Sequence, residues 1–291
     1  MVELAKFQAY GNDFLVVPPG QVEPGRFAAF ARTACDTHFG IGADGCIFLQ
    51  EAGAGPFAIR LFNRDGSETG MSGNGTRCAS AFIHREGLSR EGELHLETPS
   101  GLKCYRLLAS NHPVWTYRSS MGSPSFDPRH IPFEASIPLS RVDDWPIEVA
   151  GRTVKIAALS IGNPQCVIFG TELPGDAEFH LLGPALEKHA FFPERTNVSF
   201  ARVSGPRSLE IRIWERGVGP TLSSGTGSCG AAVAAVASGR VGAPVEVRTA
   251  SGTQFVEWQP GGEIYLTGSV EFVADIRFFW PLTAEQELRL A

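Results

Sequence analysis

Two short stretches of the chain place a serine directly before a glycine-rich loop. Ser72 opens "SGNG" at residues 72–75, and Ser224 opens "SGTG" at residues 224–227. Each stretch is followed at once by a run of small and apolar residues that predicts a helix. A helix N-terminus presents free backbone N–H groups and a partial positive charge. Each loop could therefore bind a carboxylate and stabilise negative charge that develops on it.

A pair of such loops suggests a particular reaction. One copy alone would be read as a tight turn with a serine N-cap, which is common. Removing the α-proton of an amino acid spreads negative charge into its carboxylate. Inverting that carbon also needs a proton acceptor on one face and a proton donor on the other. Two equivalent serine loops would supply both faces, so the pattern favours racemisation or epimerisation of a carboxylate-bearing carbon.

The resemblance between the loops belongs to a longer internal repeat. Four landmarks recur in the same order, 151 or 152 residues apart: Asn12 and Asn163, Ile59 and Ile211, Ser72 and Ser224, Thr98 and Thr249. Four collinear matches indicate a tandem duplication. We expect the divide between the two copies in the proline-rich, less regular stretch at residues 113–146.

Each copy shows the same coarse order of elements. Alternating apolar segments predict strands at residues 4–7, 14–17, 59–62, 102–107, 154–158, 166–169, 209–214 and 254–258. Helical patterns occur at residues 24–35 and 181–190. The helices after the two loops are expected at residues 76–86 and 228–238, and each ends near a glycine. The second of them is almost entirely small and apolar, which is typical of a helix buried on all sides. Each half is therefore expected to be a curved sheet around one buried helix.

Composition and charge exclude several classes of protein. The chain of 291 residues is 43% apolar and carries a net charge of −6, with no basic stripe for nucleic acid. It shows neither a signal peptide nor an apolar run of about 20 residues that could span a membrane. The six cysteines have no metal-binding spacing and are expected to be reduced thiols of a cytoplasmic protein. No lysine lies in a Schiff-base setting, so we expect neither a metal nor an organic cofactor.

Eight motifs resemble those of one family. They are "GNDF" (11–14), "GIGADG" (40–45), "FNRDGSE" (62–68), "GNGTRC" (73–78), "GNPQCV" (162–167), "PERTN" (193–197), "ERGVGPT" (215–221) and "SGTGSC" (224–229). The chain resembles the diaminopimelate epimerases, which are cofactor-independent amino-acid isomerases. The resemblance implies an α+β fold of two pseudo-symmetric domains, each a curved mixed sheet or barrel around a central helix, with the active site in the cleft between them. We expect residues 1–118 to form the first domain, with residues 271–291 packing back on it, and residues 119–270 to form the second.

The resemblance also implies roles for individual residues. The acid and base fall on Ser72 and Ser224. The reacting carboxylate would bind the backbone of Gly73, Asn74, Gly225 and Thr226. The far amino-acid group would be read by Asn12, Asn63, Asn163, Asn197, Glu215 and Arg216. The implied reaction converts LL- to meso-diaminopimelate, a precursor of lysine and peptidoglycan, by two-base proton transfer at Cα. The expected partner is a small amino acid rather than nucleic acid or membrane, and a homodimer is the assembly to test.

The sequence departs from the family at the reacting groups. Diaminopimelate epimerases use two cysteines where this chain has serines, and the histidine that follows "GNP" is Gln165 here. An alcohol is a much weaker acid than a thiol and needs help to act as a base. Cys78 and Cys229 are expected to face the core rather than to replace the serines. Three interpretations stay open: an epimerase that works with serines, a dehydratase of a β-hydroxy amino acid on the same fold, and a catalytically silent or engineered form that binds diaminopimelate.

Overall fold

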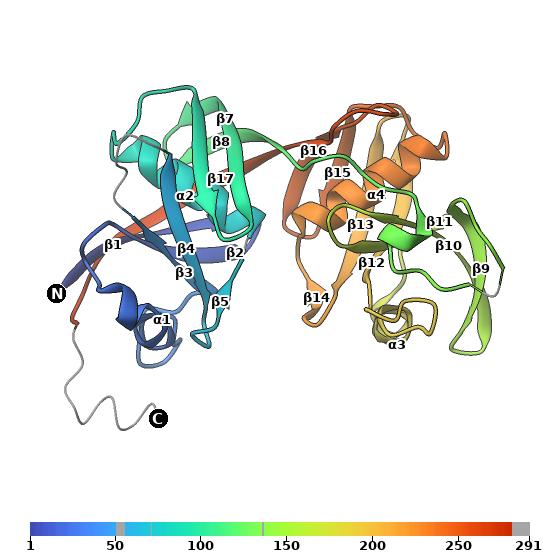
Figure 1. Cartoon of the computed structure of the whole chain (residues 1–291), viewed down its shortest axis with the longest axis horizontal. Coiled ribbons are helices and arrows are strands. Elements are labelled where there is room, and N and C mark those ends of the chain that lie inside the picture. The colour runs from blue at the N-terminus through green and yellow to red at the C-terminus, as the bar shows by residue number, and fades with distance from the viewer. Residues whose placement is uncertain (51–55, 71, 136, 281–291) are drawn as a thin grey trace. The chain divides into compact units, whose positions relative to one another are not determined.

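The computed structural model describes residues 1–50, 56–70, 72–135 and 137–280 (Figure 1). Its α-helices are α1 (Phe27–Ala34), α2 (Gly73–Arg85), α3 (Asp176–Glu187) and α4 (Gly225–Ala237). Its strands are β1 (Val2–Ala9), β2 (Asn12–Val17), β3 (Gly45–Leu49), β4 (Phe57–Asn63), β5 (Glu68–Thr69), β6 (Glu93–Thr98), β7 (Gly101–Asn111), β8 (Val114–Ser120), β9 (Val142–Val149), β10 (Arg152–Ser160), β11 (Pro164–Gly170), β12 (Asn197–Gly205), β13 (Ser208–Glu215), β14 (Gly219–Thr221), β15 (Val245–Thr249), β16 (Gly252–Glu257) and β17 (Tyr265–Phe278).

The chain divides into two compact units. The first comprises Met1–Ser119 and the segment from Ser269 onward, and the second comprises Ser120–Gly268. Strand β17 returns the chain to the first unit, where it pairs antiparallel with β1 from Val2↔Phe278 to Gln8↔Glu271. Of the C-terminal segment 271–291 that we expected on the first half, residues 281–291 lie outside the described residues.

The two units repeat one topology. Strands β2 and β3 pair in parallel, as do β11 and β12 at the corresponding place in the second unit. The parallel pair β4–β6 likewise corresponds to β13–β15. The central helices α2 and α4 begin at Gly73 and Gly225, which are 152 residues apart. The shared strand order therefore confirms the fold that the sequence repeat predicted, two related halves built on one plan.

Each sheet carries a helix on both faces. In the first unit α2 and α1 both contact β3. The side chains of β3 alternate between the two layers, with Ile47 packed in the cluster around α2 and Phe48 in the cluster around α1. Strand β3 is consequently buried at every position. Because both faces are covered, its sequence is continuously apolar and lacks the alternation by which strands are recognised.

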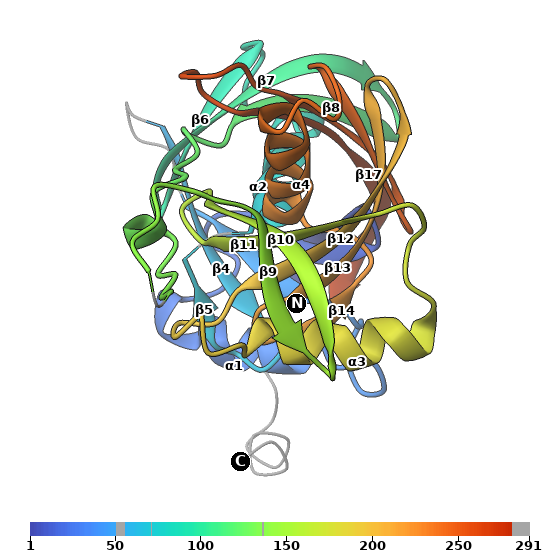
Figure 2. The same ribbon diagram turned by 90° about the vertical axis from the view of Figure 1, so that its right-hand side faces the viewer.

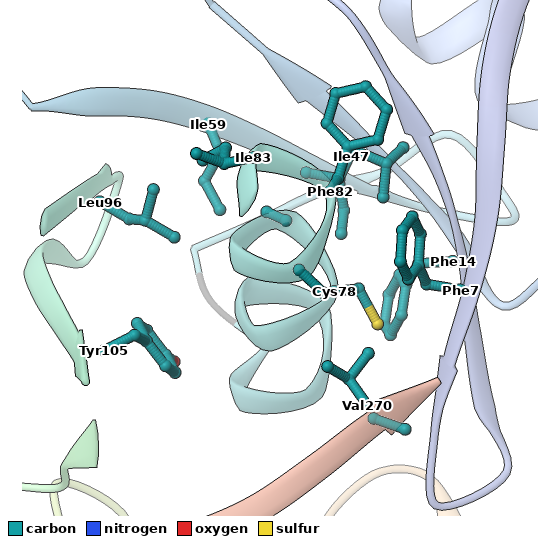
Figure 3. Packing of buried hydrophobic residues seen from close by; sticks show 14 of the residues in the cluster. Phe7, Phe14, Ile47, Ile59, Cys78, Phe82, Ile83, Leu96, Tyr105 and Val270 are labelled. Carbon is teal, nitrogen blue, oxygen red and sulfur yellow. The ribbon is translucent and has the colours of Figure 1, made fainter. Parts of the chain in front are cut away.

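Helix α2 is the centre of the first core. Its residues Cys78, Phe82 and Ile83 pack among apolar side chains from β1 to β4, with β17 also contributing (Figure 3). Phe82 meets Phe7 of β1 edge to face, with ring centroids 6.4 Å apart. Removing water from such apolar surface is the main force that holds the strands around the helix.

Helix α4 has the same role in the second unit. Its sequence, "GTGSCGAAVAAVA", is nearly all small residues, so strands β10–β13 can approach it closely (Figure 2). At Gly230 a Cβ atom would lie 3.0 Å from the Cβ of Gln165 on β11. The predicted burial of this helix on all sides is confirmed, since Cys229 and every residue from Gly230 to Ala235 are buried.

One expectation about local structure was wrong. Both central helices begin three residues earlier than predicted, at Gly73 and Gly225. The glycines argued against helix there, yet the preceding serine caps the helix and the packing requires the small residues. The boundary between the two units, at Ser119 and Ser120, falls within the stretch 113–146, which also contains β8 and the first part of β9.

Candidate active site

Ser72 is the N-cap residue of α2. Its backbone is extended, with φ −134° and ψ 121°, and the N–H of Gly75 donates to its Oγ at 3.1 Å. The hydroxyl of Thr76 donates to the Ser72 carbonyl at 2.7 Å. The serine side chain therefore lies at the positive end of the helix, where a negative charge is stabilised.

Ser224 has nearly the same geometry at the start of α4. Its φ and ψ are −143° and 127°, and the N–H of Gly227 donates to its Oγ at 3.3 Å. The Thr226 hydroxyl lies 3.4 Å from the Ser224 hydroxyl. Within the described chain, no carboxylate or imidazole hydrogen-bonds to the Oγ of either serine. Both hydroxyls thus lie at a helix terminus and accept one backbone N–H, and among the described residues neither has an adjacent general base.

The two glycines of the first loop have different surroundings, whereas in the second loop a Cβ at either glycine would lie 3.1 Å from an apolar side chain. At Gly75 a Cβ would lie 2.6 Å from Leu61, and at Gly227 it would lie 3.1 Å from Ile213, the repeat counterpart of Leu61. The second glycine of each loop is therefore required by packing. A Cβ at Gly73 would meet nothing within 4 Å. The space beside its backbone is open, so a ligand can approach the N–H groups of this helix end.

A polar chain links two of the predicted residues in the first unit, Asn12 and Asn74, with Asp44, which was not predicted. The Asn12 amide donates to Asp44 Oδ2 at 2.7 Å, and its Oδ1 accepts from the Asn74 amide at 3.4 Å. The Asn63 amide donates to Ser67 Oγ at 2.9 Å, in the turn after β4. The structure thus connects Asn12 and Asn74 directly, whereas Asn63 is exposed and held by its own turn.

Three of the predicted residues of the second unit, Asn197, Glu215 and Arg216, lie on or support one turn, between β13 and β14. Asn197 is buried; its amide donates to the Pro164 carbonyl and its Oδ1 accepts the Arg216 N–H, both at 3.0 Å. Both ends of this side chain are therefore occupied in supporting the turn. Asn163 accepts a hydrogen bond of 2.7 Å from the Gln165 amide. Burial raises the pKa of Glu215, which immediately precedes Arg216.

Glu187 supports the same turn and was missed in the sequence. It is buried near the end of α3, where Oε2 accepts the Trp214 indole N–H at 2.8 Å and Oε1 accepts the Gly217 N–H at 3.0 Å. Burial alone would raise the pKa of Glu187, but these hydrogen bonds outweigh it and hold the pKa below its usual range. The carboxylate thus clamps both ends of the segment that carries Glu215 and Arg216. A lone acid on a helix gave no sequence signal for this contact.

The native cysteines do not replace the serines. Cys78 and Cys229 are fully buried, each in the apolar core around its own helix. Burial raises the pKa of Cys78, which disfavours the thiolate. This agrees with the expectation that both residues face the core.

Away from these residues, the structure brings together three side chains that could bind a metal. In the described chain, ligand atoms of Glu93, His95 and Cys104 lie within 4.8 Å of one another on β6 and β7. Arg106 already forms an ion pair with Glu93 at 3.3 Å. The group contains none of the predicted site residues.

No helix in the described residues is long and apolar enough to cross a membrane.

The duplicated serine loops and the surrounding motifs match a known family along most of the chain. The model of the diaminopimelate epimerase family matches residues 4–126 and 157–273. The chain belongs to the diaminopimelate epimerase family. It is accordingly an isomerase of the amino-acid epimerase class.

Two relatives illustrate the extent of the match. The diaminopimelate epimerase of Pelotomaculum thermopropionicum is 38% identical over 274 residues, covering 94% of this chain and 97% of the relative. That of Desulforudis audaxviator is 40% identical over 276 residues, covering 94% and 98%.

Solved structures confirm the diaminopimelate epimerase-like fold. A phenazine biosynthesis protein of Bacillus anthracis gives a TM-score of 0.66 at 13% identity, covering 96% of this chain and 99% of that one. A hydroxyproline epimerase of Agrobacterium vitis gives 0.61 at 17% identity, covering 94% and 91%. At these identities the likeness concerns the fold alone.

Proposed function

We propose that the protein interconverts LL- and meso-diaminopimelate, with Ser72 and Ser224 as the acid–base pair. The observation that carries the proposal is the identical placement of two hydroxyls, each an extended N-cap with the N–H three residues on donating to its Oγ. Epimerisation needs two such groups on opposite faces of one carbon. A duplicated fold provides one from each copy.

The helix ends would bind the reacting carboxylate. The backbone N–H groups at Gly73, Asn74, Gly225 and Thr226 belong to the first turns of α2 and α4. N–H groups in a first helical turn have no partner within the helix and are free to donate to a ligand. They would also stabilise the negative charge that spreads into the carboxylate when the α-proton leaves.

The remaining site residues would recognise the far end of the substrate. A zwitterionic amino-acid group needs a cation for its carboxylate and an anion for its ammonium. Arg216 and Glu215 offer this pair on one turn, held by Asn197 and Glu187. Asn63, the repeat counterpart of Glu215, is uncharged, so the two copies differ in what they can bind. This difference suits a ligand whose distal group is read mainly by the second copy. Asn12 and Asn163 complete the proposed set.

The serines set the rate that we expect. A hydroxyl at a helix terminus gains from the helix dipole and one N–H donor, but the described residues provide no base that would take its proton. We therefore expect slow turnover with substrate binding retained, since binding uses backbone groups and side chains other than the serine hydroxyls.

Proton exchange in heavy water tests the proposal. The purified protein is incubated in turn with LL- and meso-diaminopimelate, and deuterium at Cα, stereochemistry and elimination products are followed by NMR. We expect deuterium incorporation together with inversion. Elimination from a β-hydroxy amino acid without inversion of diaminopimelate would establish the dehydratase instead. Binding of diaminopimelate without any exchange would mean that the protein is catalytically silent.

A further inference from the structure

A buried arginine lies under the first serine loop. Arg77 is on α2, one and a half turns after Ser72, and only 1% of its side chain is exposed. Its guanidinium donates to Asn74 Oδ1 and lies 5.8 Å from the centroid of the Tyr10 ring. Its Nε has no hydrogen-bond partner, and within the described chain no carboxylate lies within ion-pair distance. A buried cation without an anion is costly, and none of the roles assigned so far uses it.

Arg77 starts a hydrogen-bonded chain with a fixed direction. The chain runs from Arg77 through Asn74 and Asn12 to Asp44, and Asp44 Oδ2 also accepts the Asp13 N–H at 3.1 Å. A guanidinium can only donate, and a carboxylate can only accept. The two ends therefore determine which way both amides point. Asp44 is exposed, so solvent screens its charge. Arg77 is buried, so its charge is screened much less.

The second unit has no equivalent charge. Cys229 stands at the repeat position of Arg77, and Thr226 at that of Asn74. The α4 sequence from Gly225 to Ala237 contains no charged side chain. The two loops are thus alike in backbone and unlike in the charge beneath them.

The other titratable groups near Arg77 do not cancel its charge. Tyr105 and Cys78 are both buried, and burial raises the pKa of each, which keeps them neutral. On the strands packed against α2, Lys6 and Asp13 form an ion pair of 2.6 Å with each other. Among the residues that the structure describes, Arg77 therefore remains an unbalanced buried charge beside this loop.

We propose that Arg77 makes the first loop the more anion-stabilising of the two, so that residue 72 gives up its proton more readily than residue 224. Its catalytic meaning rests on the proposed epimerase function: residue 72 would act as the base and residue 224 as the acid in the resting enzyme. Arg77 is a positioning residue in this account, because it acts through Asn74 and through its field rather than on the substrate.

Thiols introduced at the two positions report the difference without any substrate. Ser72→Cys and Ser224→Cys are made singly, and each thiolate is titrated by its ultraviolet absorbance against the parent protein. Arg77 lies about 8 Å further along the helix axis than Ser72 at about 1.5 Å per residue. At an effective dielectric constant of about 20, a charge at that distance lowers a thiol pKa by roughly one to one and a half units. We expect the thiol at position 72 to have the lower pKa by about that amount.

A second substitution isolates the arginine. Arg77→Gln in the Ser72→Cys protein should raise the pKa of the new thiol by about one unit, and in the Ser224→Cys protein it should raise the thiol pKa by clearly less, because that thiol is farther from the charge. Arg77→Lys retains the charge and should keep most of the effect. It is also the variant to use if Arg77→Gln fails to fold, as judged by circular dichroism. Equal thiol pKa values at positions 72 and 224 would overturn the proposal, and so would a thiol pKa at position 72 that does not change when Arg77 is replaced. Either result would leave the epimerase function intact.

Discussion

Replacing Glu187 with glutamine should loosen the turn that carries Glu215 and Arg216. The native carboxylate accepts two hydrogen bonds, from the Trp214 indole at 2.8 Å and from the Gly217 N–H at 3.0 Å. A hydrogen bond to a buried charged acceptor contributes about 1.5–3 kcal/mol. Glutamine keeps one acceptor oxygen and turns its NH₂ toward the other donor, so about one such bond is lost. The free energy of unfolding should fall by about 1.5–3 kcal/mol.

The loss of unfolding free energy in Glu187→Gln should depend on pH, and the direction of that dependence follows from the pKa of Glu187. The pKa of Glu187 is held below its ordinary value of 4.5. Its stabilising contribution is therefore complete above about pH 4.5 and disappears as the pH falls through the lower, folded-state pKa. Urea unfolding at pH 7 and at several lower pH values should show a difference between native protein and variant that is largest at pH 7 and shrinks as the pH falls below 4.5. The KM for diaminopimelate should rise at pH 7, with a smaller change in kcat.

Glu178→Gln is the matched control on the same helix. Glu178 is partly exposed and pairs with Arg152 at 2.8 Å near the surface, where such pairs contribute at most about 1 kcal/mol. We expect this variant to be close to the native protein in stability and in KM. If Glu187→Gln were as stable as this control at pH 7, with an unchanged KM, the proposed clamp would be refuted.

Three further substitutions test the site. Gly75→Ala should lower the free energy of unfolding by about 1–3 kcal/mol, because its Cβ would lie 2.6 Å from Leu61. Gly73→Ala should leave the free energy of unfolding nearly unchanged in the same urea titration. It should raise KM instead, because it places a methyl group beside the N–H groups proposed to bind the carboxylate. Glu215→Gln should raise the melting temperature by about 1–3 °C at pH 7, because burial raises the pKa of Glu215 and the carboxylate is therefore a cost to the folded state. That gain in melting temperature should disappear below pH 4.5, where Glu215 is protonated in both the folded and the unfolded state. Substrate affinity should fall at pH 7. Equal melting temperatures of native protein and variant at pH 7 would contradict this prediction.

The sequence predicted the elements whose pattern is local. The alternating segments around Ile59 and Ile211 became β4 and β13, and the all-apolar pattern of α4 indicated its burial. Strand β3 was not predicted, because both its faces are covered and its residues do not alternate. The starts of α2 and α4 were misplaced because glycine disfavours a helix in isolation, whereas here Leu61 and Ile213 leave no room for a side chain.

Some residues of the candidate site could likewise be predicted from the sequence, and others could not. The serine loops were visible because they occur twice with one spacing. Asp44 and Glu187 were not singled out, since each acts on residues far away in the sequence: Asp44 on Asn12, and Glu187 on Trp214 and Gly217. Such contacts exist only after the strands have brought these segments together. A family motif contained Asp44, but nothing local distinguished its role.

The most direct test of the central claim is the rate of the double variant Ser72→Cys/Ser224→Cys with LL-diaminopimelate. A thiolate at a helix N-terminus is a better base near neutral pH than an alcohol. The groups proposed to bind the substrate are unchanged, so KM should stay within about twofold while kcat rises by roughly tenfold or more. A variant that binds diaminopimelate normally but epimerises it more slowly than the serine protein would show that Ser72 and Ser224 are not the acid–base pair of this reaction.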